Sequence, residues 1–133
     1  MKRIFIALAS LAVLAAPAGA NAQRSVEGRW QNPKGSVVIE VDRCGAALCG
    51  TVVKASAKAK KNAREGGTDY LVGTKILSDV RPDGKGGFKG RAFVPKHNIH
   101  AGATIRWAGP DTMLVKGCLI GVICKEQRWT RVR

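Results

Sequence analysis

The chain has 133 residues, with 23 Lys and Arg against nine Asp and Glu, and a net charge of +14. This length provides one domain and excludes two domains of ordinary size. The charge favours polyanionic partners, which it attracts through a non-specific interaction that salt weakens.

The first 22 residues predict an export signal that is cleaved after Ala22. Lys2 and Arg3 form its positive start, and the run from Ile4 to Ala16 is almost entirely apolar. This run is shorter than the stretch of about 20 apolar residues that a stable transmembrane helix needs. We therefore expect a mature chain of residues 23–133 without a transmembrane segment, in the bacterial periplasm or outside the cell. There it would meet no nucleic acid, and the available polyanions would be lipid head groups, lipopolysaccharide phosphates and wall polymers.

Short β-rich runs separated by turn signals follow the leader, and they predict an all-β domain. Residues 36–42 alternate, with Val37, Ile39 and Val41 on one face, as in a half-buried strand. Pro82–Gly87 is a strong turn signal between two further runs. The strands are expected from Gly28 and over 36–42, 50–54, 71–80, 88–94, 103–107, 112–117 and 126–132. Seven or eight strands are near the number that closes a small antiparallel barrel, which we predict as the single domain.

Residues 54–69 interrupt this pattern, because they are rich in Ala, Lys, Asn and Gly and lack large apolar side chains. We expect a long, exposed basic loop, in which one helical turn is an option. The loop carries five basic residues before its first acid: Lys54, Lys58, Lys60, Lys61 and Arg64. They are candidate contacts for an anionic surface, at about 1 kcal/mol per basic residue near a charged membrane. The alternative is a loop that only improves solubility.

The four cysteines, Cys44, Cys49, Cys118 and Cys124, indicate disulfides, because their even number occurs in a small exported chain. Three pairings are possible. We favour Cys44–Cys49 and Cys118–Cys124, since each pair brackets a short turn-like segment. The C-x4-C and C-x5-C spacings are looser than those of structural zinc sites, so we predict no metal site there.

Several short motifs occur in a recognisable order. They are Gly28-x-Trp30, Cys44-Gly45, Leu48-Cys49-Gly50, Leu71-x-Gly73-x-x-Ile76-Leu77, Val115-x-Gly117-Cys118 and Gln127-x-Trp129-Thr130-Arg131. Together, over residues 26–132, they resemble the bacterial family catalogued as domain of unknown function 2147. The resemblance implies a small exported protein with a lipocalin-like (calycin) antiparallel barrel and no established activity. The chain departs from the family pattern at residues 58–68 and 93–100, so no ligand preference is carried over.

The resemblance also implies a contact that closes the barrel. In calycin barrels, the Trp of the Gly-x-Trp start packs at the closed end, beneath an Arg of the last strand. Here the pair would be Trp30 and Arg131, with Arg128 as the other candidate. A guanidinium over an indole contributes roughly 0.5–2 kcal/mol, and the contact would join the first strand to the last.

No catalytic constellation is evident. His97 and His100, the two histidines, could share a metal ion on a helix, but Pro95 and the strand-like neighbours argue against a helix. The chain has no Gly-x-Ser-x-Gly motif, and its serines lack evident His and acid partners. We therefore predict a protein that is not an enzyme, with no catalytic or metal-ligating residues and no cofactor.

Two functions remain. The first is a periplasmic barrel that binds a small or lipid-like ligand, with a cavity that could be lined by Trp107, Phe88, Phe93, Met113 and Tyr70. The second is a basic cell-envelope protein that binds anionic surfaces through residues 54–64, with a filled barrel as its scaffold. The sequence leaves open the identity of a ligand, the ligand-binding residues, the openness of the barrel and the oligomeric state.

Overall fold

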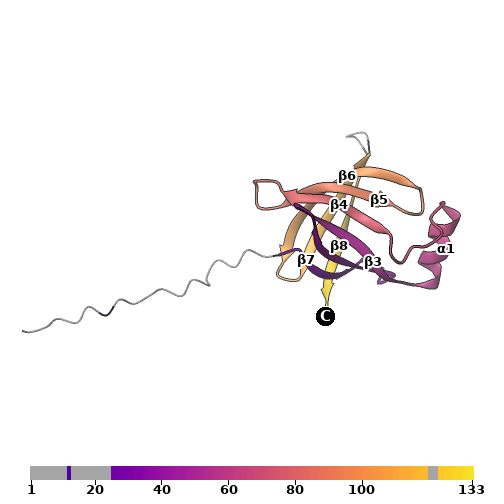
Figure 1. Ribbon diagram of the computed structural model, residues 1–133, viewed down its shortest axis with the longest axis horizontal. Helices are drawn as coiled ribbons and strands as arrows, with labels where there is room; N and C mark the ends of the chain where they lie inside the picture. Colours follow the sequence, from indigo (N-terminus) through magenta and orange to yellow (C-terminus); the bar gives the residue numbers. More distant parts are fainter. Residues whose placement is uncertain (1–11, 13–24, 120–122) are drawn as a thin grey trace, which may run out of the picture.

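The computed structural model describes residues 12, 25–119 and 123–133. The expected export signal at residues 1–22 therefore lies outside the described residues, apart from Ala12. The elements in chain order are β1 (Gly28–Gln31), β2 (Val37–Cys44), β3 (Ala47–Ala55), α1 (Ala57–Glu65), β4 (Lys75–Pro82), β5 (Phe88–Val94), β6 (Ile99–Gly109), β7 (Thr112–Leu119) and β8 (Ile123–Val132) (Figure 1).

The strands form a closed antiparallel barrel in sequence order, and β8 returns to pair with β1. This confirms the prediction of a small antiparallel barrel, with eight strands. Because consecutive strands reverse direction, the connections alternate between two ends. The terminal end contains residues 25–27 and the turns β2–β3, β4–β5 and β6–β7. The helix end contains α1, the turns β1–β2 and β5–β6, and the positions where β7 ends and β8 begins.

Apolar side chains fill the interior of the barrel. On β2, Ile39 and Val41 are buried, whereas the next residue, Asp42, is exposed. The largest fully buried side chains are Trp30, Ile39, Met113, Val26, Val52 and Val80. They come from β1 to β4, from β7 and from the segment before β1. Ile105 of β6 and Trp129 of β8 belong to the same buried cluster, so one core supports the domain.

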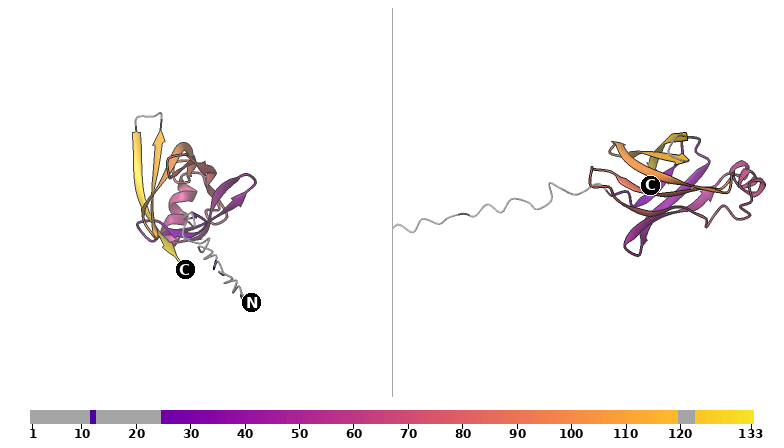
Figure 2. Two further views of the ribbon diagram at one scale, coloured as in Figure 1. Left: turned by 90° about the vertical axis from the view of Figure 1, so that its left-hand side faces the viewer. Right: turned by 90° about the horizontal axis from the view of Figure 1, so that it is seen from above.

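Residues 57–65 correct the prediction of a long loop, because they form the helix α1. Ser56 caps the helix, and its hydroxyl accepts a hydrogen bond from the backbone N–H of Ala59 at 3.1 Å. Alanine and lysine are strong helix formers. Ala63 is buried in the core cluster and Ala59 packs against it. Small side chains let the helix lie close across the far end of the barrel, as the left view of Figure 2 shows.

The end of α1 is fixed to the β5–β6 turn. A side chain at Gly66 would collide with the backbone of Lys96. Thr68 also donates a hydrogen bond from Oγ1 to the carbonyl oxygen of Pro95 at 3.1 Å. These contacts hold α1 across the barrel and leave its outer surface exposed.

The two largest differences from the predicted strand boundaries are at the starts of β4 and β6. The strand expected from Leu71 begins at Lys75, because residues 71–74 turn: the N–H of Thr74 donates to the carbonyl of Leu71 at 3.0 Å. The strand expected from Ala103 begins at Ile99. Its hairpin turns at Asn98, which has a positive φ of 51°, a conformation that asparagine tolerates better than most residues.

Candidate functional site

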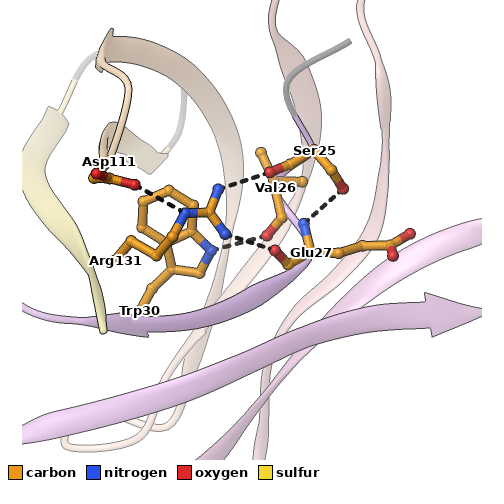
Figure 3. A network of polar contacts seen from close by, with 6 residues as sticks. All are labelled: Ser25, Val26, Glu27, Trp30, Asp111 and Arg131. Atoms are coloured by element: carbon orange, nitrogen blue, oxygen red, sulfur yellow. Dashed lines mark hydrogen bonds and ion pairs between the residues drawn. The ribbon is translucent and has the colours of Figure 1, made fainter. Parts of the chain in front are cut away.

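Arg131 lies over Trp30 at the terminal end, where the last strand meets the first (Figure 3). The guanidinium carbon is 4.3 Å from the centroid of the indole ring. The indole Nε1 in turn donates to the carbonyl oxygen of Val26 at 2.8 Å. Arg128, the other candidate for this contact, is exposed.

The same guanidinium also binds the segment that precedes β1. Its Nη1 donates to the carbonyl of Glu27 at 2.8 Å, and its Nη2 donates to the carbonyl of Ser25 at 2.9 Å. Its Nε lies 3.4 Å from Oδ1 of Asp111 in the β6–β7 turn. Arg131 thus contacts three parts of the chain: β1, the segment before it and the β6–β7 turn. These contacts pair the charge and the donors of the Arg131 guanidinium, so the arrangement has a structural role and contains no reactive group.

The residues proposed from the sequence to line a cavity do not gather around one. Met113 is fully buried in the core, and Phe88 and Trp107 pack against the core cluster. Phe93 contacts His100 instead, with the ring centroids 4.9 Å apart. Tyr70 is a correction, because its side chain is 84% exposed in the loop after α1.

Two shallow hollows among the described residues are lined mostly by exposed or half-buried residues. One of about 220 Å³ is lined by Asp79, Arg81, Lys89, Gly90 and Arg91 on β4 and β5. The other, of about 160 Å³, lies at the β1–β2 turn and the end of β3. Neither resembles the enclosed, mostly apolar cleft of 300 Å³ or more that typically holds a small ligand.

The basic residues of the 54–64 segment lie together at the helix end. Lys58, Lys60, Lys61 and Arg64 belong to α1, Lys54 lies on β3 just before it, and all five are exposed. Lys61 forms one ion pair, in which its Nζ lies 4.0 Å from Oε1 of Glu65. The helix therefore presents a basic surface to solvent, which we call the basic helix surface and define by these five residues.

The cysteines pair locally, as Cys44–Cys49 and Cys118–Cys124, which is the pairing favoured from the sequence. Cys44 and Cys49 bracket the β2–β3 turn. Cys118 and Cys124 are register partners on β7 and β8. Each bond therefore holds the end of one hairpin, at opposite ends of the barrel.

The two histidines are exposed, in and next to the β5–β6 turn. Among the described residues, no group of three or more His, Cys, Asp or Glu side chains could hold a metal ion. The structure also contains no helix, in the part of the chain that it describes, long and apolar enough to cross a membrane.

Sequence reasoning missed one feature of the helix end. Three large apolar side chains of the described residues are exposed: Tyr70, Val72 and Ile123. The run from Leu71 was predicted as a strand, and β8 was expected to begin only at Glu126. The signal available in the sequence is the apolar character of the segment between Cys118 and Cys124, which the cysteine spacing alone predicts to be turn-like.

Comparison with known proteins identifies the family and the fold. A family model described as "Uncharacterized protein conserved in bacteria (DUF2147)" matches residues 28–131. No curated protein matches the chain. A similar solved structure is protein HP1028 from Helicobacter pylori, described as belonging to the lipocalin family. It has 16% sequence identity and a TM-score of 0.64, and the match covers 82% of this chain and 84% of that one.

Proposed function

Because the chain belongs to the DUF2147 family of uncharacterized bacterial proteins and folds as a lipocalin-like barrel, we propose a role in binding rather than catalysis. We infer that it is a protein of the bacterial cell envelope, periplasmic or secreted, that binds anionic surfaces. The basic helix surface makes the contact, and the filled barrel is its scaffold.

The observation that carries this proposal is the charge on α1. Four of its nine residues are Lys or Arg, and only Glu65 is acidic. The buried side of the helix uses Ala63, so the charged side chains extend from the barrel without competing for core positions. A cationic side chain near an anionic membrane contributes about 1 kcal/mol, and the attraction falls off within a Debye length.

The two disulfides support the proposed location. Such bonds persist in oxidising compartments such as the bacterial periplasm and are rare in the cytosol. The anionic surfaces present there carry phosphate and carboxylate groups on lipids, lipopolysaccharide and wall polymers. A salt-sensitive association with such surfaces is the behaviour expected of the basic helix surface.

Binding to anionic vesicles and to lipopolysaccharide tests this function. Replacing the five residues of the basic helix surface by Gln should weaken binding about a hundredfold or more at low salt, given about 1 kcal/mol per basic residue. Gln keeps helix propensity close to that of Lys and Arg. A matched control removes five exposed charges elsewhere: Lys85, Lys89, Arg91, Arg106 and Arg133. If both variants lost the same amount of binding affinity, the interaction would depend only on net charge, and the basic helix surface would be rejected as the binding site.

A small apolar ligand is the second candidate function. One observation favours it: Val94, Ile99 and Ala101, on the strand pair β5–β6, are half-buried near the helix end. Barrels of eight strands can hold one small ligand. Native mass spectrometry of protein purified from its own cell envelope should then show a bound molecule of constant mass. If every preparation showed only the mass of the polypeptide without a ligand, this candidate function would be rejected.

A further inference from the structure

The three large apolar side chains that are exposed among the described residues all belong to the helix end. Tyr70 is 84% exposed, Ile123 69% and Val72 44%. Tyr70 and Val72 belong to the connection between α1 and β4, and Ile123 begins β8. The basic helix surface is at the same end. Isolated exposed apolar residues are common on proteins, but their restriction to the end that also carries a basic helix is a specific arrangement.

The loop after α1 holds its two apolar side chains outward. Leu71, between them, is buried in the core, so its neighbours Tyr70 and Val72 point away from it. The N–H of Gly73 donates to the carbonyl of Val52 at 2.8 Å, and the hydroxyl of Thr74 donates to the carbonyl of Tyr70. The loop is therefore anchored, and little conformational entropy is lost when its exposed side chains become buried.

The β7–β8 hairpin presents a second apolar pair. Leu119 and Ile123 are register partners next to the Cys118–Cys124 bond. Pairing of β7 with β6 reaches Cys118, and pairing of β8 with β1 covers Thr130–Val132. The hairpin thus extends beyond its neighbours, as the left view of Figure 2 shows, and the disulfide fixes its two strands.

A basic side chain, Lys125, follows the apolar pair Leu119 and Ile123 along β8. Lys125 is exposed on the same side of β8 as Ile123, two residues and about 7 Å further from the hairpin end at 3.3 Å per residue. That is a suitable separation for an ammonium group among head groups when an apolar side chain enters the acyl boundary, which lies about 5–10 Å deep for interfacial elements.

From this arrangement we propose that the anionic surface is a lipid bilayer, into which the helix end inserts Tyr70, Val72 and Ile123. The inference rests on the proposed function and specifies its partner. The basic helix surface and Lys125 contact anionic head groups, while the apolar side chains contact the acyl boundary. Figure 1 shows α1 at the right and the start of β8 at the top. These elements lie on different sides of the barrel, so a bilayer reaches both only when the barrel is tilted against it.

Fluorescence quenching tests insertion directly. The full mature chain carrying Ile123→Trp, or Tyr70→Trp, is mixed with vesicles of phosphatidylcholine and phosphatidylglycerol whose acyl chains are brominated. The introduced indole should be quenched. The matched control is Leu114→Trp, at a half-buried position of β7 whose register partners are Arg106 and Arg128, away from the hairpin end; it should show no added quenching. Melting temperatures establish that the variants are folded.

Vesicle co-sedimentation provides the second measurement. At about 1 M NaCl, where the Debye length is about 3 Å, electrostatic binding is largely screened and apolar insertion persists. The double variant Tyr70→Ser, Ile123→Ser should weaken this residual binding about tenfold or more. Leu114→Ser should leave it unchanged.

The outcomes separate this inference from the proposed function. If the double variant binds like the wild type and no introduced indole is quenched, insertion is rejected, while salt-sensitive binding through α1 still supports the proposed function. If the five-Gln variant binds normally but the Ile123→Trp indole is quenched, the basic helix surface is rejected and insertion stands. Wild-type protein that binds lipopolysaccharide but no phosphatidylglycerol vesicle also rejects the bilayer as partner.

Discussion

At the scale of single residues, Arg131 makes contacts of three different kinds. It combines stacking on Trp30, two hydrogen bonds to backbone carbonyls and an ion pair with Asp111. Stacking on an aromatic ring together with donation in fixed directions requires a planar guanidinium, which lysine lacks. The resemblance to calycin barrels pointed to this pair, but the role of the backbone of Ser25 and Glu27 could not be predicted from side-chain types.

Replacing Arg131 by Ala should lower the free energy of unfolding by about 2–4 kcal/mol, because it removes the stacking contact and leaves charge-assisted hydrogen bonds unmade. Urea denaturation measures the change. Arg128→Ala is the control, since this arginine is exposed on the same strand, and it should stay within about 0.5 kcal/mol of the wild type. Equal stability of the two variants would contradict the closing role of Arg131.

The hydrogen bonds of the Asp83 carboxyl predict that the stability of the fold depends on pH. Hydrogen bonds from the backbone N–H groups of Lys85 and Gly87, at 2.7 and 3.1 Å, hold the pKa of this carboxyl below its ordinary value. A lowered pKa in the folded state means that the carboxylate stabilises the fold above its ordinary pKa. The stabilisation is lost as the pH falls through the lowered value. The stability difference between wild type and Asp83→Ala should therefore shrink at strongly acidic pH, and denaturation curves at several pH values would refute this if the difference stayed constant.

At the scale of elements, the strands follow the sequence pattern closely and α1 does not. β5 occupies residues 88–94, as predicted, because Pro82–Gly87 supplies the turn and the run that follows is rich in apolar residues. The 57–65 segment lacks large apolar residues, so hydrophobic periodicity could not reveal that Ala59 and Ala63 face the barrel. A close approach between a helix and a barrel end selects small residues, and composition alone does not distinguish that pattern from a loop.

The packing of α1 gives a test at this scale. Ala63→Leu should destabilise the protein by about 1–3 kcal/mol, the usual cost of overpacking, because Ala63 is 1% exposed. Ala57→Leu, at an exposed position of the same helix, should have little effect. Thermal unfolding followed by circular dichroism compares the two, and similar melting temperatures would show that α1 does not pack on the barrel as described.

At the scale of the whole molecule, the two ends of the barrel carry different kinds of contacts and side chains. Contacts of Arg131 with backbone carbonyls join the chain at the terminal end, whereas the basic helix surface and the exposed Tyr70, Val72 and Ile123 belong to the helix end. The net charge of +14 favours a polyanionic partner, and the five candidate basic residues lie in one segment of the sequence. The sequence could not show that Tyr70, Val72 and Ile123 share an end with them, since this depends on how distant connections alternate around a closed barrel.

The salt dependence of the dissociation constant for phosphatidylglycerol vesicles most directly tests binding through the helix end. The account predicts tight binding at low salt that weakens steeply as salt rises, and a much shallower dependence for the five-Gln variant of α1. The control variant without Lys85, Lys89, Arg91, Arg106 and Arg133 should retain most of the wild-type slope. A five-Gln variant with the wild-type slope would contradict the account.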